Sequence, residues 1–275
     1  MTADYKNVAN TLQNTFGQAF YDRAQFIPRA ENIVALFKGF HAILCQYSLC
    51  QTAQPQHVLL KKYAAELEEE VLNSLCLFCQ TKKDCSSCRS KASEITAEFI
   101  NTLPEIQKLL ITDIRAAYEG DPAAVDEIET LLCYPGVTAI TYQRMAHFLY
   151  THGVRIIPRI ITEYAHSLTG IDIHPGAQIG PAFFIDHGTG VVIGETCVIG
   201  AHVKLYQGVT LGAKSFPLDK NGNPIKGIKR HPNIKDHVII YAETTILGNI
   251  TVGEGSVIGA NKWITHDIPP HSKID

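Results

Sequence analysis

Residues 191–212, VVIGETCVIGAHVKLYQGVTLG, carry an aliphatic residue at every sixth position. The spacing continues on both sides of this segment, and glycine often follows the aliphatic residue directly. Thirteen aliphatic residues lie in phase: Ile173, Ile179, Ile185, Ile193, Ile199, Leu205, Leu211, Ile234, Ile240, Ile246, Val252, Ile258 and Ile264. A short fixed repeat is typical of a β-helix, in which each hexad supplies one short strand and one corner. Glycine lets the corner backbone turn without a Cβ penalty. The C-terminal part of the chain is therefore predicted to be a parallel β-helix.

The repeat is interrupted twice, and a solenoid can insert residues only at its corners. The first interruption adds two residues beside Asp186-His187-Gly188. The second adds 17 residues after Leu211, has the Gly, Asn and Pro content of an exposed loop, and leads into Arg230-His231-Pro232. Loops on a rigid scaffold often carry function. We therefore expect a functional site at these two corners, each of which holds a histidine.

The two halves of the chain have different periods. Apolar residues before about position 165 are spaced by three and four, as in amphipathic helices. Helices are predicted over 31–44, 58–77 and 95–114, the last with Ser93 as its N-cap and Gly120 just beyond its end. The expected fold is α+β and multidomain. We expect an α-helical domain over residues 1–168 and a β-helix domain over residues 169–275; the family resemblance given below implies that the first serves oligomerisation and the second catalysis.

The bulk composition is that of an ordinary globular protein, with 45% apolar and 19% charged residues. The net charge of −3 gives no reason to expect nucleic acid or an anionic membrane as a partner. No apolar run approaches the ~20 residues that a membrane span needs, and the N-terminus lacks the apolar region of a signal peptide. We therefore expect a cytoplasmic protein. Its eight cysteines would be thiols or metal ligands rather than disulfides.

A carboxylate and a histidine recur about one coil apart. One coil of three hexads is about 18 residues, so Asp172 and His187 can come close along neighbouring corners. A carboxylate beside an imidazole fixes its tautomer and stabilises the imidazolium, and such a pair can take a proton from a hydroxyl. On spacing alone, the alternative that His174 and His187 merely fill polar corners stays equally open.

Several motifs at these corners resemble the serine acetyltransferase family. They are Asp172-Ile-His-Pro-Gly-Ala-Gln-Ile-Gly180, Asp186-His-Gly-Thr-Gly-Val-Val-Ile-Gly-Glu-Thr196, Gln207-Gly-Val-Thr-Leu-Gly212 and Arg230-His-Pro232. The resemblance extends back to Asp113–Ala124 and forward to Pro269–His271, and so covers more than half of the chain. It implies a left-handed β-helix of triangular section. It also implies acetyl transfer from acetyl-CoA to the hydroxyl of L-serine, the first step of cysteine biosynthesis.

The resemblance also implies roles for single residues. His187 would be the general base, and Asp172 the carboxylate that orients it. The residues that resemble the family's serine-binding set are Asp121, Asp186, Arg230 and His231. These residue types suit a zwitterionic amino acid, whose carboxylate needs a guanidinium and whose ammonium needs carboxylates.

Acetyl-CoA is implied as the co-substrate, lying along the β-helix with its thioester near His187. The positions that match small residues beside the pantetheine arm are Gly212, Ala213, Ala242 and Ala260. Lys262 stands where the family more often has a small residue. Its side chain would either modify the CoA groove or contact a phosphate of CoA, or it would simply be solvated. Transfer would be direct, without a covalent enzyme intermediate, and Cys197 is expected in the core.

The helical half contains two CxxC motifs that the resemblance does not supply. They are Cys76-Leu-Phe-Cys79 and Cys85-Ser-Ser-Cys88. Paired CxxC motifs indicate a zinc or iron–sulfur site, and four thiols around a helix end are the equally open alternative. A metal here would be structural or redox-sensing.

The resemblance implies partners as well. We expect a homotrimer or a dimer of trimers, with the CoA groove between neighbouring β-helices, and feedback inhibition by L-cysteine in the serine pocket. Members of the family often have a flexible tail ending in isoleucine that docks into O-acetylserine sulfhydrylase. Here Ile274 is penultimate and little tail follows the last coil, so we do not expect that complex.

Three other functions fit parts of the pattern. An acetyltransferase that acts on a sugar or xenobiotic hydroxyl would share the fold but would not need Arg230 and Asp186. A lyase like the γ-class carbonic anhydrases would bind zinc through His187, His202 and His231, although Asp172 placed to pair with His187 argues against it. A non-catalytic regulator would use the cysteine cluster as a sensor.

Overall fold

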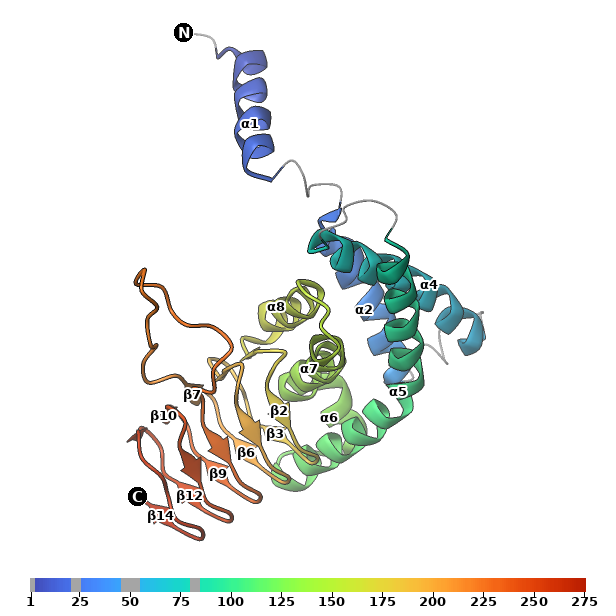
Figure 1. Cartoon of the computed structure of the whole chain (residues 1–275). Coiled ribbons are helices and arrows are strands. Elements are labelled where there is room, and N and C mark those ends of the chain that lie inside the picture. Colours follow the sequence, from blue (N-terminus) through green and yellow to red (C-terminus); the bar gives the residue numbers. More distant parts are fainter. Residues whose placement is uncertain (1–2, 21–25, 46–54, 80–84) are drawn as a thin grey trace.

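The computed structural model describes residues 3–20, 26–45, 55–79 and 85–275, and it divides into a helical half and a half made of short strands (Figure 1). The helices are α1 (Tyr5–Phe20), α2 (Ala30–Leu44), α4 (Gln56–Leu77), α5 (Ser86–Gly120), α6 (Glu127–Cys133), α7 (Pro135–Thr151) and α8 (Ile157–Thr169). None of the helices in the described ranges is long and apolar enough to cross a membrane.

Two of the three predicted helices are confirmed with nearly the same bounds, as α2 and α4. The third is much longer than predicted. Ser93 is not its N-cap, because α5 begins at Ser86 with Cys85 as N-cap, and it ends at Gly120 with Asp121 as C-cap. Pro104 lies inside α5, where it removes one backbone hydrogen bond. The buried apolar face runs past it on both sides, which explains why the helix continues.

The strands form a parallel β-helix of three sheets. The first sheet has the order β1-β4-β7-β10-β13, the second β11-β8-β5-β2 and the third β14-β12-β9-β6-β3. Their bounds are β1 (Asp172–Ile173), β2 (Gln178–Ile179), β3 (Phe184–Ile185), β4 (Val192–Ile193), β5 (Val198–Ile199), β6 (Lys204–Leu205), β7 (Thr210–Gly212), β8 (Asn233–Ile234), β9 (Ile239–Ile240), β10 (Thr245–Leu247), β11 (Thr251–Val252), β12 (Val257–Ile258), β13 (Trp263–Ile264) and β14 (Lys273–Ile274).

The register confirms the repeat seen in the sequence. In the first sheet, Ile173 pairs with Ile193, Ile193 with Leu211, Leu211 with Ile246, and Ile246 with Ile264. Each of these side chains is almost completely buried. Stacked aliphatic side chains thus form one continuous core along the axis of the β-helix.

Between its sheets the chain turns along three edges. The His187 edge joins the third sheet to the first and comprises residues 186–191, 206–209, 241–244 and 259–262. The Arg230 edge joins the first sheet to the second and comprises residues 174–177, 194–197, 213–232 and 248–250. The third edge joins the second sheet to the third and comprises residues 180–183, 200–203, 235–238, 253–256 and 269–272.

A buried ion pair joins the helical half to the first coil of the β-helix. Arg144 of α7 donates to both carboxylate oxygens of Asp113 of α5, at 2.8 and 2.9 Å. The same guanidinium donates to the backbone carbonyls of Ile179 and Gly180, and Asp113 accepts from the backbone N–H of Phe183. Because both charges are paired and hydrogen-bonded, this contact fixes the C-terminal end of α5 beside the β-helix.

Candidate active site

The predicted catalytic and serine-binding residues, Asp172 excepted, fall into two groups at different edges of the β-helix. His187 and Asp186 lie on the His187 edge, and Asp121 comes to them from the end of α5. Arg230 and His231 lie on the Arg230 edge. The first sheet, with its outward-facing strand residues, lies between the two edges.

His187 occupies the two-residue bulge in the repeat. Its φ is 57° and that of Gly188 is 89°, so both adopt the left-handed backbone that non-glycine residues rarely take. The side chain of His187 is 72% exposed, and its Nδ1 lies 3.7 Å from Oδ1 of Asp186. The bulge therefore presents an accessible imidazole beside a carboxylate rather than packing it into the corner.

Asp121 and Lys204 connect the helical half to this group. Oδ2 of Asp121 accepts a hydrogen bond of 2.5 Å from the hydroxyl of Tyr134, and Oδ1 accepts from the N–H of Ala123. These two bonds hold the pKa of Asp121 below its usual value. Nζ of Lys204 donates to the carbonyl of Gly120 at 2.7 Å and lies 3.9 Å from Oδ2 of Asp186. Two carboxylates, one lysine and one imidazole are thus gathered at this edge.

The Arg230 edge carries a continuous chain of short hydrogen bonds. Nη2 of Arg230 donates to Oε2 of Glu195 at 2.5 Å, and the hydroxyl of Tyr150 donates to Oε1 at 2.6 Å. Both bonds hold the pKa of Glu195 below its usual value although its burial opposes them. The guanidinium has five N–H donors, so it keeps donors for a ligand while Glu195 fixes its orientation.

His231 is held in one tautomer by its neighbours. Its Nδ1 accepts from the backbone N–H of Thr196 at 3.1 Å, so Nε2 carries the proton when the ring is neutral. Burial and the charge of Arg230 lower the pKa of His231 to about 4. The ring lies directly over Gly194, where a Cβ would overlap with its Cδ2 and Nε2 atoms. His231 is therefore a neutral hydrogen-bond donor in a fixed place.

Asp172 stands at the start of β1, outside both groups. Its Oδ1 lies 3.8 Å from Nη2 of Arg159 of α8. Among the described residues, its ion-pair partner is thus Arg159 rather than His187. The orientation of His187 by Asp172 stays a prediction.

The four residues predicted to flank acetyl-CoA are also divided between the two edges. Ala242 and Ala260 lie in successive coils of the His187 edge, beyond His187 along the axis. Gly212 ends β7 and Ala213 begins the long loop of the Arg230 edge. Lys262 lies on the His187 edge too, half-buried beside Ala260. The structure therefore does not gather this set within a single chain.

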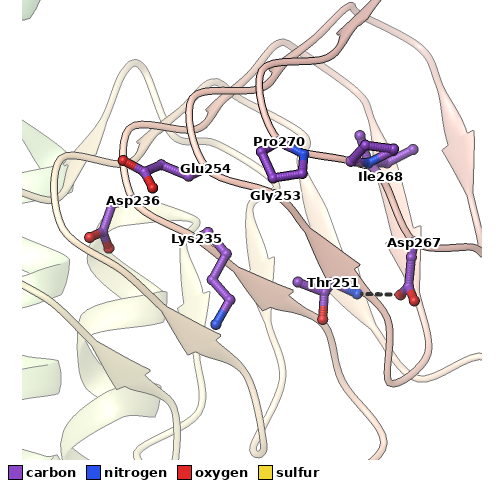
Figure 2. Close-up of a pocket in the computed structure, with 9 residues that line it drawn as sticks. Lys235, Asp236, Thr251, Gly253, Glu254, Asp267, Ile268 and Pro270 are labelled. Atoms are coloured by element: carbon purple, nitrogen blue, oxygen red, sulfur yellow. Dashed lines mark hydrogen bonds between the residues drawn. The ribbon is translucent and has the colours of Figure 1, made fainter.

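A hollow of about 610 Å³ opens elsewhere on the β-helix. Figure 2 shows its lining, which includes Lys235, Asp236 and Glu254 of the third edge and the hydrogen bond of 2.7 Å from the N–H of Thr251 to Asp267. None of the residues predicted to take part in acetyl transfer lines this hollow, so it is separate from them.

The three histidines that a carbonic anhydrase-like zinc site would use lie far apart around the triangular cross-section of the β-helix. His187, His231 and His202 lie on three different edges of one chain. The ring of His202 stacks on that of His237, with ring centroids 4.9 Å apart. Zinc ligation by these three histidines within one chain therefore finds no support.

Four side chains of these groups were not assigned a role from the sequence. They are Tyr134, Tyr150, Glu195 and Lys204. Of these four, Glu195 could have been singled out from the sequence, because it stands in the Gly-Glu-Thr motif. Tyr150 reaches it from α7, where Nδ1 of His147 also donates to the carbonyl of Pro175 at 2.8 Å. A helical spacing of four and three places Gln143, His147 and Tyr150 on one face of α7, but that spacing does not say what the face meets.

Comparison with known proteins relates both halves to one family. The N-terminal domain of serine acetyltransferases matches residues 57–141. A plasmid-encoded serine acetyltransferase of Synechococcus elongatus is 62% identical over 183 residues, 66% of this chain and 57% of that protein. The serine acetyltransferase of Bacillus subtilis is 47% identical over 167 residues, 61% of this chain and 73% of that protein. The chain thus spans little more than half the length of the plasmid-encoded relative.

Solved structures extend the likeness to the whole fold. Entamoeba histolytica serine acetyltransferase 1 in complex with L-cysteine has a TM-score of 0.76 and 36% identity, covering 90% of this chain and 87% of that chain. Neisseria gonorrhoeae serine acetyltransferase in complex with serine has a TM-score of 0.58 and 29% identity, covering 85% and 93%. They confirm the predicted fold class, a helical N-terminal half followed by a left-handed parallel β-helix. This fold of stacked six-residue repeats places the chain in the class of hexapeptide-repeat proteins. The chain belongs to the serine acetyltransferase family.

Proposed function

We propose that this chain is a serine O-acetyltransferase, which transfers the acetyl group of acetyl-CoA to the hydroxyl of L-serine. The products are O-acetyl-L-serine and CoA, in the first step of cysteine biosynthesis. The observation that carries the proposal is the set of charged groups on the two edges, which together suit a zwitterionic amino acid and lie on a β-helix with an accessible imidazole. The set comprises carboxylates at Asp121 and Asp186 beside His187, and a guanidinium at Arg230 beside His231.

The proposed chemistry is direct transfer by general-base catalysis. His187 takes the proton of the serine hydroxyl, and the resulting alkoxide attacks the thioester carbonyl. The tetrahedral intermediate collapses, the C–S bond breaks, and the imidazolium of His187 returns its proton to the departing thiolate of CoA. The 72% exposure of His187 suits this role, because the ring has to meet two substrates. Asp172 is proposed to orient the ring once both are bound.

Serine binding is proposed to use both groups. The guanidinium of Arg230 receives the carboxylate of serine, with Nε2–H of neutral His231 as a second donor. Asp121 and Asp186 receive the ammonium, because both side chains carry carboxyl groups and lie beside His187. The Neisseria gonorrhoeae relative holds serine and the Entamoeba histolytica relative holds L-cysteine. Cysteine carries the same carboxylate and ammonium, so we propose that it competes for this pocket as a feedback inhibitor.

We propose that the active site is completed between copies of the chain. The two groups lie on different edges of one β-helix, with the first sheet between them. A neighbouring copy whose Arg230 edge meets this chain's His187 edge would bring them together. A closed ring of three such contacts gives a homotrimer, and the helical half is proposed to pair trimers. The division of Ala242 and Ala260 from Gly212 and Ala213 fits an acetyl-CoA groove at the same junction.

The four cysteines of the two CxxC motifs lie near the start of α5, at the opposite end of that helix from Asp121, and take no part in this chemistry. We place the reaction in the cytoplasm, where thiols such as those of Cys79 and Cys85 stay reduced.

The test is release of free thiol from acetyl-CoA in the presence of a candidate acceptor. We expect thiol release with L-serine, and little with a sugar, an aminoglycoside or bicarbonate at the same concentration. Mass spectrometry of the product should show O-acetyl-L-serine. Thiol release only with a non-amino-acid acceptor would overturn the proposal, as would hydration of carbon dioxide in the absence of acetyl-CoA.

A further inference from the structure

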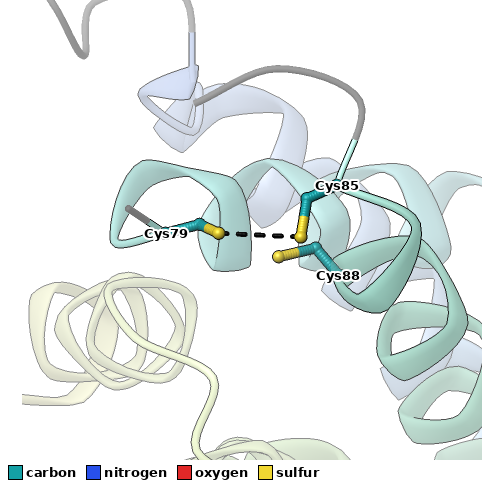
Figure 3. A group of neighbouring side chains, drawn as sticks. All are labelled: Cys79, Cys85 and Cys88. Atoms are coloured by element: carbon teal, nitrogen blue, oxygen red, sulfur yellow. Dashed lines mark hydrogen bonds between the residues drawn. The ribbon is translucent and has the colours of Figure 1, made fainter. Parts of the chain in front are cut away.

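Four cysteines converge where α4 ends and α5 begins. Cys76 lies in the last turn of α4 and Cys79 follows the end of that helix. Cys85 is the N-cap of α5 and Cys88 is its third residue. Figure 3 shows the thiols of Cys79, Cys85 and Cys88 directed toward one another. The two CxxC motifs are thus brought face to face by two helix ends.

The distances between the thiols of Cys79, Cys85 and Cys88 are those of ligands around a single ion. Sγ of Cys79 and Sγ of Cys85 are 3.6 Å apart, and the Sγ atoms of Cys79, Cys85 and Cys88 all lie within 4.8 Å of one another. The thiol of Cys76 hydrogen-bonds to that of Cys88. Four thiolates at about 2.3 Å from a tetrahedral zinc ion are about 3.8 Å from one another. An iron–sulfur cluster, which holds several iron atoms, spreads its cysteine ligands farther apart.

The surroundings suit an anionic metal centre. A zinc ion with four thiolates carries a net charge of about −2. The side chain of Arg89 interacts electrostatically with Cys76, and the guanidinium of Arg155 lies 4.7 Å from the ring of Phe78, inside the first motif. Cys85 and Cys88 stand at the N-terminus of a 35-residue helix, whose dipole favours negative charge. All four cysteines are half-buried, so an ion can enter and is then partly shielded from water.

We propose that Cys76, Cys79, Cys85 and Cys88 bind one zinc ion as four thiolates. Each thiol loses its proton to solvent when the ion binds, and zinc does not change its oxidation state. Four protein ligands leave no position for a substrate or a water, so the ion is structural. It ties the end of α4 to the start of α5.

This clamp acts on the helix that positions Asp121. Helix α5 has the clamp at its first turn and Asp121 as its C-cap, about 50 Å away along the helix axis at about 1.5 Å per residue. The ion therefore stabilises the α4–α5 pair without touching the proposed active site. Zinc binding is a property of the helical half and does not depend on whether the chain acetylates serine.

The test is the zinc content of the full-length chain, purified under reducing conditions and dialysed against zinc-free buffer. We expect about one zinc ion per chain by inductively coupled plasma mass spectrometry. Replacement of zinc by Co²⁺ in the wild-type chain should give the visible bands and the sulfur-to-metal charge-transfer band of tetrahedral thiolate ligation. The cobalt spectrum does not depend on any variant folding correctly.

Variants then assign the ion to the cluster. Cys79→Ser and Cys88→Ser should lower the zinc content about tenfold or more. The matched control is Cys133→Ser, because Cys133 is exposed at the end of α6, outside the cluster. The control should keep the zinc of the wild type. Removal of zinc by a chelator should lower the melting temperature by about 10 °C.

Four outcomes would overturn the proposal. The first is a reduced wild-type chain that binds neither zinc nor cobalt, and the second is a chain that contains iron and inorganic sulfide in place of zinc. The third is a mass lower by two hydrogens in the reduced preparation, which would indicate a disulfide. The fourth is an equal loss of zinc in Cys133→Ser and Cys79→Ser. Acetyl transfer to serine enters none of these measurements, so failure here and failure of the proposed function are separate results.

Discussion

The His187 edge and the Arg230 edge belong to the same β-helix but are built in opposite ways. His187 stands in a two-residue bulge with its side chain 72% exposed, and its closest ionic neighbour is Asp186 at 3.7 Å. At the other edge, Arg230 and Tyr150 both donate hydrogen bonds to Glu195, and His231 is only 6% exposed. One edge is open around a single imidazole, whereas the other is a network with fixed hydrogen bonds.

This difference indicates how the two edges share the work. A general base has to approach the hydroxyl and then the departing thiol, so an accessible ring is useful there. A group that receives a carboxylate binds best when its orientation is fixed in advance, because little conformational entropy is then lost on binding. We infer that the His187 edge determines turnover, whereas the Arg230 edge determines affinity for serine.

The largest expected effect is on turnover and comes from the His187 edge. His187→Ala should lower kcat by about 10²-fold or more, because the general base is lost. The KM for L-serine should change little, since the carboxylate of serine is held at the other edge. Steady-state thiol release measures both constants. His202→Ala, on the third edge, is the control and should keep nearly the wild-type rate. A near-normal kcat in His187→Ala would end the assignment.

The next effect is on affinity and comes from the Arg230 edge. Arg230→Lys should raise the KM for L-serine about 50-fold, because lysine cannot make the forked contact to a carboxylate while it also bonds to Glu195. The KM for acetyl-CoA should stay within about twofold. Lys226→Ala, exposed on the same long loop, is the control. An equal rise of both KM values would show general distortion instead of loss of one serine contact.

The scaffold could be predicted from the sequence because its signal is local. A strand of the β-helix needs one inward aliphatic residue per hexad, so a count of sixes gives the core, and departures from six give the bulge at His187 and the loop before Arg230. The supporting contacts have no such signal. Tyr150 and Glu195 are 45 positions apart, and Lys204 and Gly120 are 84 apart, so only the folded chain shows that they meet. The N-cap at Ser93 was wrong for a similar reason, because the buried face of α5 begins before it.

If the two edges meet between copies, two defective chains should complement each other. His187→Ala and Arg230→Met chains should each be nearly inactive alone. Trimers that contain both variants should recover about a third of the wild-type activity, because one of their three junctions then pairs two intact edges. Coexpression with two different affinity tags supplies the mixture, and each variant purified alone is the control. Without recovery in a confirmed mixed trimer, the site would have to lie within one chain.

The fixed position of His231 can be tested through the glycine beneath it. Gly194→Ala places a methyl group where the ring now lies, so the ring has to shift and the KM for L-serine should rise about fivefold. The kcat should fall less than in His187→Ala. Gly222→Ala, at a loop position with open space around it, is the control and should leave both constants near normal. An unchanged KM in Gly194→Ala would show that the network is not as rigid as the hydrogen bonds indicate.

The smallest expected effect is on stability at acid pH. His231 of the Arg230 edge and His41 of α2 have pKa values of about 4 in the folded chain, chiefly because burial disfavours their charged forms, against an ordinary value of 6.5. Between pH 6.5 and about 4 the unfolded chain therefore binds more protons, and the free energy of unfolding falls as the pH falls. The melting temperature should drop by a few degrees across this window, and by less in His231→Asn, where the contribution of His41 remains. If the melting temperature changed equally with pH in His231→Asn and wild type, the ring of His231 would not be held neutral by its surroundings. The Arg230 edge would then not differ from the His187 edge in the electrostatic way proposed here.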